Sequence, residues 1–167
     1  MKVVVVSDTH LPRFGDQLPA GLLRGLGAEG VERILHLGDF TGPEIPRLFE
    51  TVAPLEAVAG NNDPPTLVRR FGRRKVVTLD GVRVGMVHGD GTQGTTVTRS
   101  LRTFEREEVD VICFGHSHRP VCERHGEIWI VNPGSPTDKR TERRYSYAIL
   151  DIQGARAEPR LVFFDRD

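Results

Sequence analysis

Six short apolar segments, each followed by polar residues of a functional type, constrain the fold of this chain most strongly. The segments are residues 3–6, 34–37, 57–59, 84–87, 111–114 and 128–131. Their length and their β-branched content predict buried strands. Each one leads at its carboxyl end into Asp, Asn, His or Gly. Because ligands bind at the carboxyl edge of open α/β sheets, these polar residues are expected to meet at one edge.

The residues between these segments predict helices early in the chain and hairpins late in it. Helices are predicted over residues 18–26, 43–50 and 95–107, the first with Leu22, Leu23 and Leu26 on one face. In full, the predicted strands are residues 3–6, 33–37, 55–59, 76–79, 82–87, 109–114, 121–124, 128–131, 145–152 and 160–164. Asp80-Gly81 and His125-Gly126 predict tight hairpin turns. We therefore expect one mixed α/β domain, residues 1–167, with two sheets.

Composition excludes several classes of protein. Among 167 residues, Lys and Arg number 23 and Asp and Glu number 23, so the formal net charge is zero. This balance argues against binding nucleic acid through bulk positive charge. No apolar run approaches the roughly 20 residues that span a membrane, and the first apolar segment is too short for a signal peptide. Two cysteines, Cys113 and Cys122, are interpreted as buried thiols in a reducing compartment, so a cytoplasmic protein is expected.

Seven side chains at the strand ends are candidate metal ligands. They are Asp8, His10, Asp39, Asn61, His88, His116 and His118. Carboxylates, imidazoles and an amide oxygen, without thiolate, suit Mn²⁺, Fe²⁺, Zn²⁺ or Co²⁺. The set exceeds the three protein ligands usual for one catalytic zinc ion, so two ions fit better if one carboxylate bridges them.

Charge counting indicates what such a centre does. Two divalent ions carry four positive charges, and Asp8 and Asp39 offset two of them. A hydroxide that bridges the ions leaves a net charge of plus one, which attracts a phosphate oxyanion. Metal binding can lower the pKa of water to about 7, so hydroxide is available as a nucleophile at neutral pH. The predicted chemistry is metal-assisted hydrolysis of a phosphate ester.

The order of the motifs resembles that of the calcineurin-like metallophosphoesterase superfamily. The family pattern of D-x-H, GD, GN, H and GHxH stands here as Asp8-Thr9-His10, Gly38-Asp39, Gly60-Asn61, His88 and Gly115-His116-Ser117-His118. With Asn132-Pro133-Gly134-Ser135, the chain is most similar to the small single-domain branch of bacterial and archaeal phosphodiesterases. That branch includes the eukaryotic retromer scaffold subunit. The resemblance spans residues 1 to about 150 and implies a four-layer α/β/β/α sandwich of two mixed β-sheets flanked by helices.

The resemblance also divides the seven candidates between two ions. It implies that the first ion is held by Asp8, His10 and His118. It implies that the second ion is held by Asn61, His88 and His116. Asp39 is implied as the bridge, and Mn²⁺ is expected first, with Fe, Zn, Co and Ni as alternatives.

Two positions depart from the family pattern. Many members have a histidine after the GN asparagine, where this chain has Asn62, which cannot act as a general acid. The small branch often has a histidine after His88-Gly89, where this chain has Asp90. Asp63 and Asp90 are therefore candidate catalytic residues that either orient the ligands or transfer a proton.

Other polar features have ordinary interpretations. His36 and His125 lie outside the motifs and are interpreted as core or surface residues, although His36 is close enough to Asp39 in sequence to approach the ions. Residues 132–135 predict a rigid turn that closes the site. Two basic runs, residues 69–75 and 139–144, are interpreted as solvated surface, with steering of an anionic substrate as the alternative.

The sequence thus predicts a dinuclear phosphoesterase, and a phosphodiesterase in the first place. Its expected substrate is a small phosphodiester or phosphomonoester, with no membrane partner and no bulk nucleic-acid partner. The alternative is a scaffold of the same fold that binds protein partners and has lost catalysis. Every expected ligand position carries a competent residue, which favours the enzyme. Whether the chain forms a homo-oligomer stays open.

Overall fold

The computed structural model describes residues 1–28 and 30–166, and it contains two five-stranded mixed sheets. The first sheet has the order β10-β9-β1-β2-β3, built from β1 (Lys2–Val6), β2 (Val31–His36), β3 (Leu55–Ala57), β9 (Tyr145–Gln153) and β10 (Arg156–Phe164). The second has the order β4-β5-β6-β8-β7, built from β4 (Arg74–Leu79), β5 (Val82–Val87), β6 (Val111–Cys113), β7 (Val121–His125) and β8 (Ile128–Asn132). The helices are α1 (Ala20–Leu26), α2 (Pro46–Glu50), α3 (Pro65–Phe71) and α4 (Thr96–Thr103).

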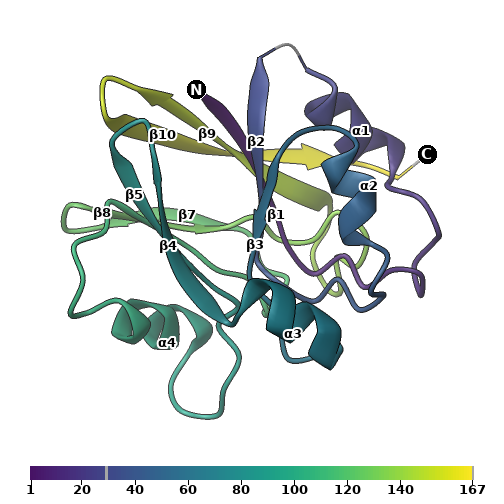
Figure 1. Cartoon of the computed structure of the whole chain (residues 1–167), viewed down its shortest axis with the longest axis horizontal. Helices are drawn as coiled ribbons and strands as arrows, with labels where there is room; N and C mark the ends of the chain where they lie inside the picture. The colour runs from purple at the N-terminus through teal and green to yellow at the C-terminus, as the bar shows by residue number, and fades with distance from the viewer. Residues whose placement is uncertain (29, 167) are drawn as a thin grey trace.

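The first strand shows how the layers are held together. Alternate side chains of a strand face opposite sides of the sheet. Val3 and Val5 pack in the cluster between the two sheets, while Val4 and Val6 pack in the cluster beneath α1, α2 and α3. A third cluster, which includes Phe104 and Ile112, fills the space between α4 and the second sheet. Both faces of each sheet are therefore covered, and the expected α/β/β/α order of layers is confirmed (Figure 1).

The register brings the ends of the parallel strands level. Val6 pairs with His36, and His36 pairs with Ala57. In the second sheet, Met86 pairs with Cys113, which pairs with Val131. Each parallel set therefore sends its polar continuations out at its own carboxyl edge, as the sequence predicted.

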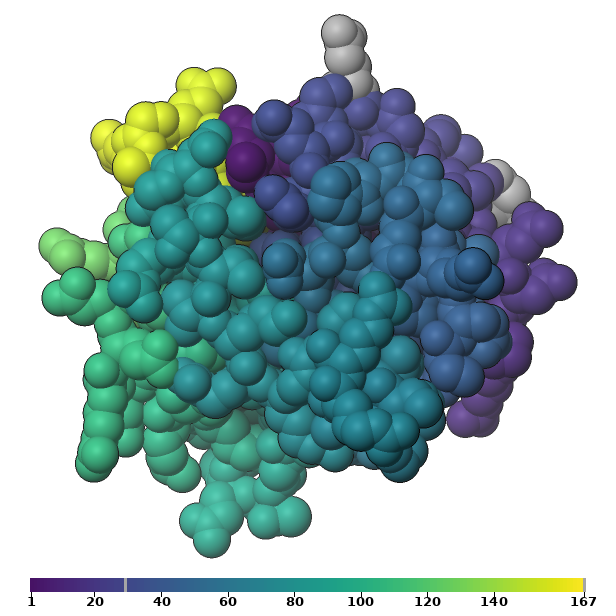
Figure 2. All heavy atoms as spheres, in the orientation of Figure 1, coloured from purple at the N-terminus to yellow at the C-terminus, as the bar shows by residue number. Residues whose placement is uncertain are grey.

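Local sequence features explain where two of the outer helices, α3 and α4, begin. Pro65 occupies the first turn of α3, where its missing N–H costs no hydrogen bond. Thr95 caps α4, because its side-chain oxygen accepts a hydrogen bond from the backbone N–H of Thr98. The side-chain oxygen of Thr98 in turn accepts from the backbone N–H of Thr95. In Figure 2, the exposed loop of residues 90–95 projects from the lower edge of the molecule.

Several predicted boundaries were wrong. No helix was predicted over α3, which begins at Pro65 directly after Pro64. The helix predicted over residues 43–50 begins at Pro46, and the one predicted to reach residue 107 ends at Thr103. Leu23 is 45% exposed, so it does not share the buried face of Leu22 and Leu26. β10 begins at Arg156 rather than at residue 160, because an edge strand tolerates Pro159 and alternating charges.

Both predicted hairpins are present, but the second turns at Gly126-Glu127 rather than at His125-Gly126. Leu79 pairs with Val82 across Asp80-Gly81, and His125 pairs with Ile128 across the turn that begins at Gly126. Among residues 1–28 and 30–166, no helix is long and apolar enough to cross a membrane.

Candidate metal centre

Four buried ligand atoms converge at the sheet edge without a hydrogen-bond partner among the described residues. They are Asp8 Oδ1, His10 Nε2, His88 Nε2 and His118 Nε2. Asp8 Oδ1 lies 3.4 Å from His118 Nε2, 3.7 Å from His88 Nε2 and 3.8 Å from His10 Nε2. A buried polar atom without a partner is costly, so such a cluster points to a bound cation.

The donors form two groups that share a carboxylate. Asp8, His10 and His118 form one group, and Asp8, Asp39 and His88 form the other, with the ligand atoms of each within 4.8 Å of one another. Asp39 Oδ2 lies 3.4 Å from His10 Nε2 and 3.3 Å from His88 Nε2, one histidine from each implied ion site. This donor set fits two divalent ions, and the position of Asp39 suits the bridging role that the resemblance implies.

The backbone sets the tautomer of two of these histidines. His88 Nδ1 lies 2.7 Å from the carbonyl oxygen of Leu37, and His118 Nδ1 lies 2.6 Å from that of Asp138. A carbonyl only accepts, so Nδ1 carries the proton when the ring is neutral, and Nε2 turns a lone pair toward the site. Histidine ligands of metal ions are commonly oriented in this way.

Electrostatics favour negative carboxylates and a protonated His88. Burial by itself raises the pKa of Asp8, but His10, His118 and His88 outweigh it and hold that pKa well below the ordinary value. Burial opposes the charge on His88, yet Asp39 and Asp8 raise its pKa to about 9. An ion at Nε2 therefore has to displace a proton.

The backbone at this edge adopts an unusual conformation. Five of the seven candidate ligands have positive φ: Asp8 (56°), His10 (47°), Asp39 (61°), His116 (69°) and His118 (59°). The left-handed region costs a non-glycine residue roughly 1–2 kcal/mol. Such strain concentrates at functional sites, where the surrounding fold holds it in place.

Two glycines let the loops approach the carboxylates. A Cβ on Gly60 would lie 2.2 Å from Asp39 Oδ1, and one on Gly115 would lie 2.0 Å from Ser7 Oγ and 2.7 Å from Asp8 Oδ2. Any side chain there would displace a candidate ligand. The glycines of the GN and GHxH motifs are therefore explained by close packing.

The other two candidate ligands lie at the same edge but outside the tight clusters. The ring of His116 is half-buried and lies edge-on to His88, with centroids 5.2 Å apart. Burial and the charge of His88 lower its pKa, and the charges of Asp8, Asp90 and Asp39 oppose them. Asn61 follows Gly60 and is exposed. Both roles stay predictions.

Asp63 braces the loop that carries the bridging candidate. Its carboxylate accepts hydrogen bonds from the backbone N–H groups of Gly60 (2.7 Å), Asp39 (2.8 Å) and Thr41 (2.9 Å). Burial raises the pKa of Asp63, and these three donors oppose that shift. The contacts favour the orienting alternative for Asp63 over proton transfer, whereas Asp90 is exposed.

His36 does not face the cluster. Its Nδ1 accepts from Gly38 N at 3.1 Å, which places the proton on Nε2, 3.2 Å from Thr9 Oγ1. The ring stacks on Phe40 at 3.6 Å, and burial lowers its pKa to about 3. His36 is therefore a core residue with both nitrogens used.

Residues from the end of β8 onward brace the site, and Thr137 among them was not identified from the sequence. Ser135 Oγ donates to the carbonyl of Asp8 at 2.8 Å, and Thr137 Oγ1 donates to that of Thr9 at 2.6 Å. Asn132 Nδ2 donates to the carbonyl of Gly115 at 3.1 Å. These bonds fit the predicted rigid turn at residues 132–135, but only the folded chain reveals their partners.

One residue of the first basic run reaches the site. Arg73 Nη1 lies 3.4 Å from the carbonyl oxygen of Gly60. Other members pair with acidic residues instead: Arg70 with Glu50, Arg74 with Glu107 and Lys75 with Glu56. Arg73 is thus the member of the run with a contact at the site, and steering of an anionic substrate by the run stays a prediction.

Comparison with known proteins identifies the family. The family model described as the calcineurin-like phosphoesterase superfamily domain matches residues 1–155. The chain belongs to this superfamily. A probable metallophosphoesterase of Methanothermobacter thermautotrophicus is 34% identical over 167 residues, which cover 97% of this chain and 92% of that protein.

Solved structures agree with the fold of this calcineurin-like phosphoesterase. An archaeal phosphodiesterase is 25% identical with a TM-score of 0.75, over 98% of this chain and 100% of that one. Vps29 of Chaetomium thermophilum has a TM-score of 0.78 at 22% identity, over 100% of both chains. The second likeness is one of fold. Family membership and the donor set together support a metal-dependent phosphoesterase.

Proposed function

We propose that this protein is a phosphodiesterase with two divalent transition-metal ions, Mn²⁺ in the first place. The observation that carries the proposal is the position of Asp39 Oδ2, within 3.4 Å of His10 Nε2 and 3.3 Å of His88 Nε2. One carboxylate oxygen thus faces one histidine from each predicted ion site. A mononuclear centre would need only one of these groups.

Each part of the site has a distinct task in this proposal. When bound, the two ions would polarise the phosphoryl oxygens and lower the pKa of the attacking water. Asp8 and Asp39 would hold the ions with two negative charges, so the centre would keep a positive charge that attracts phosphate. Hydrogen bonds from the backbone N–H of His116 to Asp8 and of Asn62 to Asp39 fix both carboxylates. The site is therefore preorganised for an anionic substrate.

Two features support a diester with a good leaving group. A diester carries a single negative charge per phosphate, which matches the single net positive charge of the predicted centre. Asn62, where many relatives have histidine, cannot protonate a leaving group. The archaeal phosphodiesterase that shares the fold adds support for this class of substrate.

The alternative is a scaffold that binds protein partners. The fold similarity to Vps29 supports keeping it, although the complete donor set supports the enzyme. A cytoplasmic location also belongs to this proposal.

Metal analysis and an assay separate the two functions. Protein purified without chelator should contain close to two transition ions per chain by ICP-MS. It should hydrolyse a chromogenic diester such as bis-p-nitrophenyl phosphate faster than the matching monoester. Failure to turn over either substrate with Mn²⁺, Co²⁺, Ni²⁺ or Zn²⁺ would favour the scaffold.

A further inference from the structure

Asn62 donates hydrogen bonds to both carboxylate oxygens of the bridging candidate Asp39. Its backbone N–H donates to Asp39 Oδ1 at 2.9 Å, and its side-chain Nδ2 donates to Asp39 Oδ2 at 2.8 Å. The second bond uses the oxygen that faces His10 and His88. Asn62 itself is exposed, whereas Asp39 is 2% exposed, so the amide approaches the site from its mouth.

The chemistry of a carboxylate oxygen limits what Oδ2 can hold. Such an oxygen has two lone pairs. A bridge between two ions through Oδ2, the oxygen that faces His10 and His88, would use both pairs, and the bond from Asn62 already uses one. The amide and one of the two ions therefore cannot share the oxygen.

We propose that the side chain of Asn62 competes with the second metal ion for Asp39 Oδ2, so that the second ion binds only when the hydrogen bond from the Asn62 amide to this oxygen is broken. The proposal rests on the two-ion centre proposed above. The competing ion is the one assigned to Asn61, His88 and His116, because two of those three ligands are less buried than those of the first ion. We therefore expect the competition to reduce the affinity of this second, less buried ion site.

The hydrogen bond from the backbone N–H of Asn62 to Asp39 makes it possible to distinguish competition by the side chain from a role in supporting Asp39. The N–H of residue 62 holds Asp39 Oδ1 whatever its side chain, and Asp63 holds the backbone N–H of Asp39. Removing the amide therefore leaves Asp39 oriented. Competition predicts that the second ion then binds more tightly, whereas a purely supporting role for Asn62 predicts weaker binding.

Calorimetric titration of metal-stripped protein with Zn²⁺ tests whether removal of the Asn62 amide strengthens or weakens binding of the second ion. Asn62→Leu keeps the volume and removes the donor, Asn62→Ala removes both, and Thr66→Ala alters an exposed residue of α3 as a control. A hydrogen bond to an ionised carboxylate is worth enough to change affinity by about 10- to 150-fold. We expect both Asn62 variants to tighten the weaker binding step by that factor, with the stronger step and the Thr66→Ala isotherm unchanged. An unchanged or weakened second step in both Asn62 variants would overturn the proposal.

The side-chain amide of Asn62 provides a second readout. Its ¹H–¹⁵N signals are assigned by their loss in Asn62→Leu, and Zn²⁺ is diamagnetic. We expect them to shift with the second equivalent of Zn²⁺ and to stay in place with the first. Signals that stay in place through two bound equivalents would contradict the release of the amide.

The stoichiometry separates failure of this inference from failure of the proposed centre. Two steps of unchanged affinity in all variants would overturn the role of Asn62 and leave the dinuclear centre standing. One step in every variant would overturn both. One step in the wild type that becomes two in the Asn62 variants would support competition in its strongest form.

Discussion

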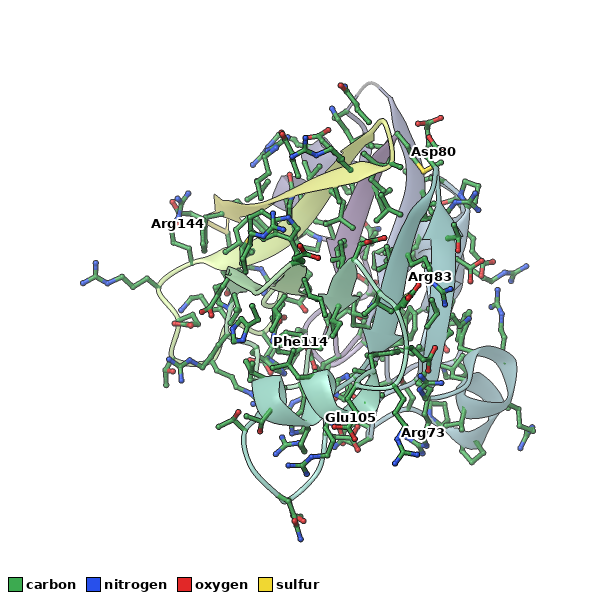
Figure 3. All side chains as sticks on the ribbon, turned by 90° about the vertical axis from the view of Figure 1, so that its left-hand side faces the viewer. Arg73, Asp80, Arg83, Glu105, Phe114 and Arg144 are labelled. Atoms are coloured by element: carbon green, nitrogen blue, oxygen red, sulfur yellow. The ribbon has the colours of Figure 1, made fainter. Side chains whose placement is uncertain are left out.

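At one end of the two sheets, left-handed residues close hairpins in solvent, and at the other end they carry buried candidate metal ligands. Asp80 (φ 46°) and Ala155 (φ 59°) lie in two-residue turns beside Gly81 and Gly154, and all four residues are exposed. Asp8 and Asp39 adopt the same region of φ but are buried. Figure 3 shows the two ends, with Asp80 at one and Arg73 and Phe114 at the other.

The comparison separates backbone geometry from function. In the hairpins, the left-handed conformation matches the twist of the strands and needs no partner for the side chain. At the candidate metal centre, the same conformation turns carboxylates and imidazoles toward one point, and hydrogen bonds from distant segments hold them there. Positive φ alone therefore does not mark a site, but positive φ together with buried, unpartnered ligand atoms does.

Replacing the two left-handed aspartates should give the largest contrast. Asn tolerates positive φ, so both Asp39→Asn and Asp80→Asn keep the backbone, but only the first removes the charge of the proposed bridge. We expect Asp39→Asn to lose at least about 100-fold in kcat/KM and to lose bound metal. Asp80→Asn should match the wild type in both. Intact metal content and activity in Asp39→Asn would show that the bridging role is wrong.

Adding a methyl group to a glycine at each end should separate crowding from backbone strain. A Cβ on Gly60 meets Asp39 Oδ1 at 2.2 Å, whereas one on Gly126 meets nothing within 4 Å. Gly60→Ala should lower the free energy of unfolding by about 1–3 kcal/mol and weaken metal binding. Gly126→Ala carries only the cost of positive φ, about 1–2 kcal/mol, and should leave metal binding intact. Urea unfolding and ICP-MS measure the two effects, and equal loss of metal in both variants would contradict the crowding argument.

Histidines at the two ends should differ in their effect on acid stability. His36 is buried with its pKa lowered from 6.5 to about 3, so between these values the unfolded chain binds a proton that the folded one does not. Stability contributed by neutral His36 is therefore present above about pH 6.5 and is lost as the pH falls, by about 2 kcal/mol at pH 5. In metal-stripped protein, His36→Gln should show a smaller drop between pH 7 and pH 5 than the wild type. His125→Gln, which alters an exposed histidine, should show the same drop as the wild type.

Arginines at the two ends should give the smallest difference. Arg73 contacts the carbonyl of Gly60, while Arg83 lies exposed on β5 away from the site (Figure 3). Arg73→Ala should raise KM for an anionic diester about two- to fivefold and reduce its dependence on salt. Arg83→Ala should leave both unchanged. An effect of the same size from both variants would indicate a general charge effect instead of a contact at the site.

Periodicity and short-range signals account for most of what could be predicted of the fold. The continuous apolar segment Val3–Val6 identified a strand covered on both faces, and Asp80-Gly81 identified a hairpin. The missed elements depend on context that lies outside these patterns. Pro64-Pro65 begins α3 because Leu67 and Phe71 find a core to pack against, and Arg156–Pro159 pairs because β9 lies beside it.

The sequence by itself determined the donor types, their order, and their place at the ends of strands. It could do so because residues that follow adjacent parallel strands must emerge at one edge. The tertiary structure alone decided the protonated nitrogens of His88 and His118, the two bonds from residue 62 to Asp39, and the bracing of Asp8 by Ser135. Those contacts join residues 20 to 127 positions apart, so they depend on how the loops pack and not on any local pattern.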